Sequence, residues 1–240
     1  MRYKLNGGIT IRSENAAKPL AQASKYLCRY IEALPPVGAS FDYGAGKLRY
    51  LNPILTTTET LTLVDSEIQL SRTQKIHRKV TSVRDVVQAS NHLAALNTQG
   101  FFATPQAFER GFCINVLSVV PTYTTREKIM LLLRSKLIDG GTCLFVVQYR
   151  NSDFTRMQAM NNSKKWRDGF LIDSFRGHSF YGLIQPTILT RMALKAGFEI
   201  VSETLDEGRV YLLVRSPRRL SRRVIGSITE GDNFHIRLAG

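Results

Sequence analysis

Hydrophobic residues along the chain fall into two kinds of pattern: short continuous runs, and longer stretches with helical spacing. Between residues 14 and 33 the apolar positions recur every three or four residues, which predicts an amphipathic helix that ends before Pro35 and Pro36. The run that closes at Asp42 and the run "LTLVD" (Leu61–Asp65) each predict a buried strand. Both of these predicted strands end on an acid.

The same patterns continue through the middle of the chain. They predict helices over residues 66–77, 83–96 and 126–137, and strands over residues 100–103, 112–120 and 142–149. Thr124 and Glu127 have the spacing of a capping box that starts the third of these helices, and Gly140 and Gly141 are expected to end it. Because strands alternate with helices, we expect a mostly parallel sheet with helices on both faces.

The last third of the chain departs from this alternation. Residues 150–184 are polar, aromatic and aperiodic, which predicts an insertion. A helix over residues 186–197 follows, with Pro186 in its first turn. Strands over residues 198–205 and 209–216 are then separated by a turn too short for a helical crossover, so they must pair antiparallel. The prediction is an α/β protein whose sheet finishes in a C-terminal antiparallel hairpin.

The glycines after the first predicted strand, in "FDYGAGKLRY", permit a sharp turn and a close approach of the backbone to a ligand. A P-loop would need serine or threonine after Gly46 and Lys47, but the chain has Leu48 there. A dinucleotide fingerprint would need a third glycine where the chain has Arg49. The loop therefore fits neither of these phosphate-binding motifs well.

The loop resembles motif I of the class I S-adenosylmethionine (SAM)-dependent methyltransferases, because Asp42, Gly44 and Gly46 match that motif. Further segments resemble later motifs of the family in the same order: "FCINVLSVVP" at the fourth strand, "LIDGGTCLFVV" at the fifth and "ALKAGFEIV" before the sixth. The resemblance covers about residues 39–148 and 185–215. It implies a Rossmann-like, seven-stranded, mostly parallel sheet, SAM as the cofactor, and methyl transfer as the activity.

The resemblance also implies a division of the chain. We expect an N-terminal helical cover over residues 1–38, a SAM-binding core over 39–148, an insertion or lid over 149–184, the C-terminal half of the core over 185–216, and a basic tail over 217–240. Acceptor recognition is assigned to the insertion, because the core that the family shares already binds the cofactor.

The expected cofactor site follows from the chemistry of SAM. A carboxylate at a strand end can accept both ribose hydroxyls, small residues let the backbone approach the amino-acid tail, and a second acid can contact the amino group of the tail. Thr104 is expected to flank the adenine, and Asn115 to face the point where the sulfonium and the acceptor meet. The cofactor-binding residues predicted in this way are Asp42, Gly44, Ala45, Gly46, Asp65, Thr104 and Asn115. No metal ligands are predicted.

Lys47 and Arg49 surround Leu48, which stands at the third glycine position of the motif. A basic side chain here can meet the carboxylate of SAM. Alternatively, Leu48 packs on the sheet while Lys47 and Arg49 lie in solvent. The sequence leaves both interpretations open.

The charge of the chain bears on its partner. Lysine and arginine number 33 against 19 aspartates and glutamates, a formal net charge of +14, which favours a nucleic acid over a membrane surface. The three cysteines show no CxxC spacing, which argues against a disulfide framework or a zinc site. We find no signal-peptide pattern and no apolar run of membrane-spanning length, so we expect a cytoplasmic protein without membrane association.

The methyl acceptor is therefore predicted to be DNA or RNA, although the sequence lacks the best-known marks of such enzymes. Asn115 is present where amino-methylating enzymes have their motif, but the prolines and the aromatic residue are missing. Cys113 lies inside a predicted strand, so we expect it to be inert. The alternatives are a small-molecule or protein methyltransferase with incidental charge, and an inactive nucleic-acid-binding protein with the methyltransferase fold.

Two segments are candidates for binding the acceptor. In the insertion, Trp166 and Arg176 belong to an alternation of aromatic and basic residues that suits stacked bases and phosphates, and equally suits an ordinary lid with an aromatic core. In the tail, Arg218 and Arg219 are predicted to hold phosphates, against the alternative of a solvated tail.

The candidate catalytic residues are His178 and Tyr181, as proton acceptors within the insertion. Asp168 or Asp173 would orient them. The assignment of His178 as a base rests on its residue type alone. A lone histidine is more often structural than catalytic.

Overall fold

The structure is a computed structural model that describes residues 2–5, 8–18, 20–150 and 152–217. The predicted phosphate-binding residues Arg218 and Arg219 lie outside the described residues.

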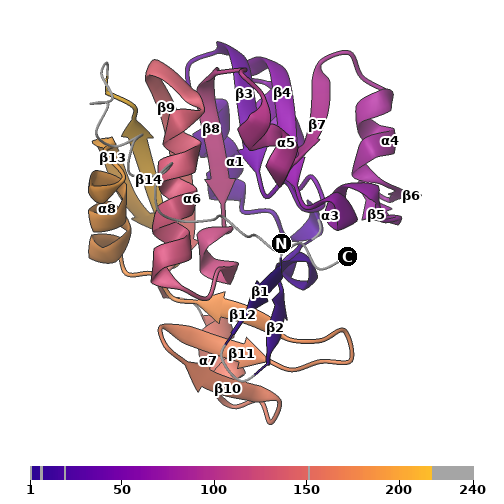
Figure 1. Ribbon diagram of the computed structural model, residues 1–240, viewed down its shortest axis with the longest axis vertical. Helices are drawn as coiled ribbons and strands as arrows, with labels where there is room; N and C mark the ends of the chain where they lie inside the picture. Colours follow the sequence, from indigo (N-terminus) through magenta and orange to yellow (C-terminus); the bar gives the residue numbers. More distant parts are fainter. Residues whose placement is uncertain (1, 6–7, 19, 151, 218–240) are drawn as a thin grey trace.

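A seven-stranded sheet in the order β13-β14-β9-β8-β3-β4-β7 runs through the centre of the described chain (Figure 1). Its strands are β3 (Val37–Tyr43), β4 (Thr58–Asp65), β7 (Leu93–Asn97), β8 (Phe108–Ile114), β9 (Leu137–Gln148), β13 (Glu199–Asp206) and β14 (Arg209–Arg215). The strands from β7 to β9 in this order pair in parallel, whereas β14 pairs antiparallel with both β9 and β13. The predicted Rossmann-like sheet with a C-terminal antiparallel hairpin is confirmed.

Helices cover both faces of this sheet, as predicted. They are α1 (Lys25–Glu32), α2 (Leu51–Leu55), α3 (Glu67–Ser71), α4 (Val83–Gln88), α5 (Thr98–Ala103), α6 (Tyr123–Ser135) and α8 (Pro186–Lys195). Fully buried side chains such as Met130 and Met192 pack α5, α6 and α8 into one apolar cluster. Leu27 and Ile54 belong to a second cluster, formed with the helices from α1 to α4. No helix in the described part of the chain has the length and apolar character needed to cross a membrane.

A smaller sheet lies beyond the carboxyl ends of the parallel strands (Figure 1). It consists of β10 (Ser163–Trp166), β11 (Gly169–Ile172) and β12 (Ser179–Gly182), with α7 (Ser152–Gln158) packed against it. The N-terminal hairpin of β1 (Arg2–Lys4) and β2 (Thr10–Arg12) reaches this sheet, where the Arg12 N–H donates to the carbonyl of His178 at 2.8 Å. We call β1, β2 and β10–β12 together the cover.

The predicted helix over residues 14–33 is wrong for its first half. Short 3₁₀ turns occupy Ser13–Ala16 and Leu20–Gln22, and the α-helix begins only after Ser24. The Ser24 hydroxyl accepts a hydrogen bond from the Leu27 N–H at 3.0 Å. This cap satisfies a donor of the first turn, so the helix starts at that point.

The predicted helix over residues 66–77 is also too long. It ends at Ser71, and a hairpin of β5 (Gln74–Ile76) and β6 (Lys79–Thr81) follows. His77 and Arg78 turn this hairpin with φ angles of 44° and 74°. Two successive positive φ angles characterise the two-residue turns that match the twist of paired strands.

The third strand lies earlier than predicted. Helix α4 ends at Gln88 and the strand is β7, whereas the "GFFA" segment that we assigned to a strand forms α5. The Asn97 side chain accepts a hydrogen bond from the Gly100 N–H at 2.8 Å and so caps α5. Local capping at Asn97 therefore outweighs the strand preference of the two phenylalanines.

Three further boundaries differ. The fourth strand stops at Ile114, and a 3₁₀ turn (Leu117–Val119) follows, because Asn115 has a φ angle of 60°. Helix α6 is capped by Thr122 rather than Thr124. Gly140–Gly141 lie within β9, where a Cβ on Gly141 would come within 3.1 Å of the Phe108 carbonyl oxygen. The close approach of β8 and β9, rather than the end of a helix, thus accounts for Gly141.

Candidate functional site

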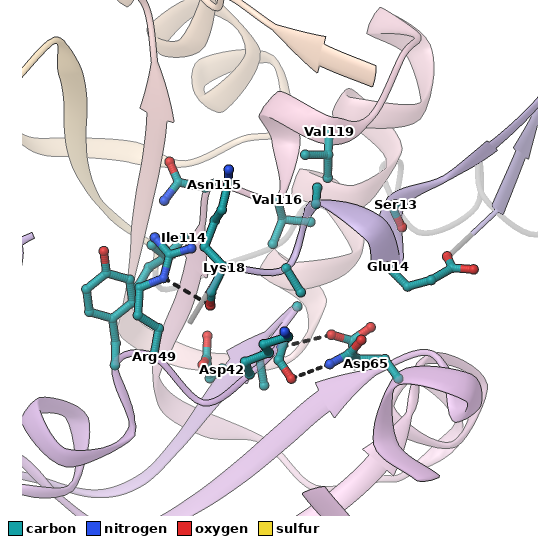
Figure 2. A pocket seen from close by; sticks show the side chains of 18 of the residues that line it. Ser13, Glu14, Lys18, Asp42, Arg49, Asp65, Ile114, Asn115, Val116 and Val119 are labelled. Atoms are coloured by element: carbon teal, nitrogen blue, oxygen red, sulfur yellow. Dashed lines mark hydrogen bonds between the residues drawn. The ribbon is translucent and has the colours of Figure 1, made fainter. Parts of the chain in front are cut away.

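A cleft lies where β3, β4 and β8 end (Figure 2). Its lining comes from these three strand ends, the loops that follow them, α3 and the N-terminal segment. The residues include Asp42, Gly44, Ala45, Gly46, Lys47, Arg49, Asp65, Gln69, Ile114, Asn115, Val116, Val119, Tyr3, Ser13, Glu14 and Lys18. In parallel α/β sheets the carboxyl ends of the strands are where ligands bind.

The glycine loop after β3 forms the floor of the cleft. Gly44 has a φ angle of 80°, and a Cβ at this position would lie 2.3 Å from Val116 Cγ2, so only glycine fits. The Gly46 N–H donates a hydrogen bond to Asp65 Oδ2 at 3.0 Å. The side chain of Gln69 donates to the carbonyl of Gly46. These bonds fix the loop with its backbone facing the cleft, so that no side chain separates the backbone from a ligand.

Leu48 adopts the left-handed conformation that a third glycine of motif I would adopt without strain. Its φ angle is 57°, and its side chain is fully buried in the apolar cluster beneath α1 and α2. A left-handed residue with a Cβ costs roughly 1–2 kcal/mol, whereas burying a leucine contributes about 1.5–3 kcal/mol. Burial therefore compensates the strain, and Leu48 packs on the sheet as one of the two sequence interpretations expected.

Asp42 is the most unusual group of the cleft. It is only 6% exposed, and no residue in the described part of the chain donates a hydrogen bond to its carboxylate. Burial, together with the negative charge of Asp65, raises the pKa of Asp42 to about 7. A buried carboxylate without a donor or cation is unfavourable, so the site favours a positively charged ligand group here.

Asp65 lies at the end of the neighbouring strand, half-buried across the cleft from Asp42 (Figure 2). Its oxygens accept hydrogen bonds from the backbone N–H groups of Ser66, at 2.7 Å, and of Gly46. Burial raises the pKa of Asp65, and these two hydrogen bonds oppose the rise. Each carboxylate oxygen retains a lone pair for a ligand donor.

Asn115 supplies a third acceptor group. Its backbone turns at a positive φ angle and its N–H donates to the Val146 carbonyl at 2.7 Å, which fixes the residue at the end of β8. The Oδ1 atom is buried, and no described residue donates a hydrogen bond to it. A buried polar atom without a partner is unfavourable, so a hydrogen-bond donor on a ligand in this cleft would satisfy this oxygen.

The N-terminal segment roofs the cleft, which the sequence did not predict. Ala17 lies so close to the loop that a Cβ on Gly46 would be 3.5 Å from the Ala17 Cβ. The Arg49 Nε donates to the carbonyl of Lys18 at 3.4 Å (Figure 2). No local pattern indicates that residues 13–18 contact the glycine loop. Gln69 also lines the cleft and was not predicted. Its position in the first turn of α3 could have indicated this, because a helix that follows a parallel strand starts at the cleft edge.

The structure brings most of the predicted cofactor residues together, with one exception. Asp42, Gly44, Ala45, Gly46, Asp65 and Asn115 all line the cleft. Thr104 does not: it caps the end of α5, and its carbonyl accepts a hydrogen bond from Lys136 Nζ. Its assignment depended on the misplaced third strand, whose true end is Asn97.

The predicted acceptor and catalytic residues lie on the cover. Trp166 packs edge-on against Phe180, with ring centroids 5.7 Å apart. His178 Nδ1 lies 3.4 Å from Asp173 Oδ1, and Tyr181 sits within β12. The carbonyl of Arg176 accepts a hydrogen bond from Asn15 at 3.0 Å, which joins the small sheet to the roof of the cleft. None of these four predicted residues lines the cleft itself.

No family model matches the sequence. The uncharacterized protein YmfD of Escherichia coli (strain K12) is 33% identical over 219 residues, which cover 90% of this chain and 96% of YmfD. The chain belongs to the YmfD family. Since YmfD is itself uncharacterized, the activity of the family has to be inferred from the site.

Solved structures show the fold of this YmfD family member. An O-methyltransferase family protein from Burkholderia thailandensis matches with a TM-score of 0.57 and 12% identity, over 81% of this chain and 56% of that protein. The 1,6-didemethyltoxoflavin-N1-methyltransferase of the same organism, with bound 1,6-didemethyltoxoflavin and S-adenosylhomocysteine, matches with a TM-score of 0.54 and 13% identity, over 79% and 78% of the two chains. The chain therefore has the class I SAM-dependent methyltransferase fold, as its motifs implied.

Proposed function

We propose that the protein is a SAM-dependent methyltransferase that acts on a small molecule. The observation that carries the proposal is the donor-free carboxylate of Asp42, buried in one cleft with Asp65 and the unpartnered Asn115 Oδ1. A cation and several hydrogen-bond donors would satisfy this set of acceptors. SAM offers an ammonium group, a sulfonium and two ribose hydroxyls.

Each part of SAM has residues suited to it. Asp65, at a strand end with lone pairs to spare, would accept the ribose hydroxyls. Gly44 and Gly46 would admit the amino-acid tail against the backbone, and Asp42 would face its ammonium group. The residues present therefore fit the cofactor that the fold implies.

When bound, SAM supplies a methyl carbon made electrophilic by its sulfonium. The chain has to exclude water and align the acceptor. Val116 and Val119 give the cleft an apolar wall next to Asn115, whose Oδ1 would accept a hydrogen bond from an acceptor amine or hydroxyl. His178 and Tyr181 remain hypotheses for the base that takes the acceptor proton, because both belong to the cover above the cleft.

Two observations support a small acceptor. The N-terminal segment roofs the cleft through the contact of Arg49 with Lys18, which favours a compact ligand over a polymer. The matched toxoflavin enzyme also binds a small molecule. The nucleic-acid acceptor predicted from the charge stays a prediction, and the salt dependence of DNA and RNA binding would test it.

The cofactor part of the proposal is tested by calorimetry with S-adenosylhomocysteine (SAH). Parent protein should bind SAH, and Asp65→Ala should weaken binding by about 10- to 100-fold, because a charged acceptor of two hydrogen bonds is lost. Asn97→Ala is the matched control, since Asn97 caps α5 and does not line the cleft. Equal SAH affinity in Asp65→Ala and the parent would contradict the assignment.

The acceptor part is tested with methyl-labelled SAM and separate pools of metabolites, DNA, RNA and protein. Label should move into the metabolite pool. Transfer into nucleic acid alone would reject the small-molecule acceptor and restore the prediction made from charge.

A further inference from the structure

Three basic residues from distant parts of the sequence lie around the N-terminal segment that roofs the cleft, near enough for their charges to interact. Lys47 lies in the glycine loop, Arg72 follows α3, and Arg176 lies between β11 and β12. Lys47 and Glu14 line the same cleft, Arg72 Nη2 donates to the Glu14 carbonyl at 3.1 Å, and the Arg176 backbone carbonyl accepts from Asn15. We call Lys47, Arg72 and Arg176 the mouth cluster.

The positive charge of the mouth cluster is poorly compensated. No carboxylate of the described residues lies within ion-pair distance of these three side chains. Burial and the charges of Arg72 and Arg176 lower the pKa of Lys47. Burial also lowers the pKa of Arg72, and the negative charges of Asp65 and Glu14, which lie farther away, oppose part of this lowering. Lys47 and Arg72 are half-buried and Arg176 is exposed, and like charges held close together favour an anionic ligand.

The arrangement leaves the donors of Lys47 available. Its side chain makes no hydrogen bond to any described residue, whereas Arg72 is held in place through its Nε, which donates to Gln74 Oε1 at 3.2 Å. One cation is thus free to adjust and another is fixed. An ammonium group beside a planar guanidinium is a common arrangement for binding a carboxylate or a phosphate.

We propose that the mouth cluster is an anion subsite that binds a carboxylate or phosphate group of the methyl acceptor. This inference rests on the proposed function and narrows it to acidic small molecules. The groups suited to SAM line the floor of the cleft, whereas Arg72 and Arg176 come from segments outside it. A negative group at the mouth would anchor the acceptor while its amine or hydroxyl reaches Asn115.

The test uses protein saturated with SAH and two probes, inorganic phosphate and benzoate, titrated by calorimetry at constant ionic strength. At least one probe should bind, and Lys47→Met should weaken its binding at least 10-fold, because a charge-assisted hydrogen bond is lost. Arg176→Met should weaken it as well. Arg191→Met, an exposed arginine on α8 far from the cleft, removes the same charge as a control and should leave binding unchanged.

A second set of titrations tests whether Lys47 binds the acceptor or the carboxylate of the cofactor. SAH carries that carboxylate and 5′-methylthioadenosine lacks it. If the mouth cluster serves the acceptor, Lys47→Met should leave the affinity for both compounds unchanged. A loss of SAH affinity alone would assign Lys47 to the cofactor tail and overturn the proposal.

Two other outcomes would also overturn it. The first is that neither probe binds the SAH-loaded protein. The second is that Arg191→Met weakens probe binding as much as Lys47→Met, which would indicate that the probes bind to general surface charge. Failure of the parent protein to bind SAH would instead reject the proposed function itself. The two failures are therefore distinguishable in one set of titrations.

Discussion

The central sheet and the cover are built by different means. The sheet is buried on both faces by two large apolar clusters, in which side chains such as Phe41, Phe145 and Leu63 are fully buried. The cover has only a small cluster of Ile11, Leu171 and Phe180. Polar contacts connect it to the rest, so a few substitutions should loosen the cover while the sheet stays folded.

One of these polar contacts is an ion pair between a buried arginine and a partly exposed aspartate. Arg126, on α6, is only 1% exposed and donates to both carboxylate oxygens of Asp168, in the turn between β10 and β11. Its Nε donates to the Val120 carbonyl at 2.8 Å, and its guanidinium lies 5.8 Å from the centre of the Phe180 ring. Asp168 thus pairs with Arg126 instead of orienting a catalytic base.

Breaking this ion pair should have a large effect. Asp168→Ala leaves the buried Arg126 guanidinium without its counter-charge, which costs about 3 kcal/mol, the low end for buried pairs, because 39% of the Asp168 side chain is exposed to solvent. We expect this loss in the free energy of unfolding, measured with denaturant, and earlier proteolysis in the cover than in the sheet. Asp173→Ala, which removes an exposed carboxylate of the same small sheet, is the control. Unchanged stability in Asp168→Ala would show that the cover does not depend on this pair.

Leu48 offers a test of the central sheet, the other part of this comparison. Leu48→Ala should destabilise the protein by about 2–5 kcal/mol, because it leaves a cavity under α2. Leu48→Gly removes more of the side chain, yet it also removes the left-handed strain at the φ angle of 57°. We therefore expect Leu48→Gly to be the less destabilising of the two variants in denaturant unfolding. The reverse order would mean that the backbone of Leu48 is not strained.

A smaller effect should appear in the pH dependence of SAH binding. The ammonium group of SAH favours ionised Asp42, whose pKa in the free protein is about 7. Binding below this pH must release a proton, so affinity should rise by up to about tenfold per unit as the pH increases toward 7, and then level off. Asp42→Asn should abolish this rise, and 5′-methylthioadenosine, which lacks the ammonium group, should not show it.

Asp42 also makes the stability of the protein depend on pH, with the opposite sign: SAH affinity should rise with pH, whereas the free energy of unfolding should fall. Its pKa in the folded state lies above its ordinary value of 3.8, so the folded protein holds a proton that the unfolded chain releases. This contribution to the free energy of unfolding is fully present below pH 3.8 and is lost as the pH rises to about 7. Asp42→Asn should remove that part of the pH dependence of unfolding. A pH profile identical to that of the parent would contradict the raised pKa.

The sequence was most informative where function depends on local geometry. Asp42, Gly44, Gly46 and Asp65 were found because acids at strand ends and glycines in a tight turn have a recognisable spacing. The mostly parallel sheet and its antiparallel ending followed from the alternation of elements and the closing hairpin. Thr104 was misplaced because capping by Asn97 outweighed the strand preference of "GFFA".

The roof of the cleft and the mouth cluster had no such signal. Glu14 and Lys18 lie in the stretch whose spacing predicted a helix, Ser13 directly precedes it, and all three line the cleft only through tertiary contacts. Arg72 and Arg176 are separated by more than a third of the chain and meet only at the cleft mouth. Spacing along one sequence carries no information on such encounters.

The most direct test of the account is a calorimetric comparison of SAH with NAD on the parent protein and Asp42→Asn. We expect the parent to bind SAH and not NAD, and Asp42→Asn to bind SAH about 10-fold or more weakly, because the charge facing the ammonium group is lost. Binding of NAD without binding of SAH, or equal SAH affinity in the two proteins, would contradict the claim that this cleft is a SAM site.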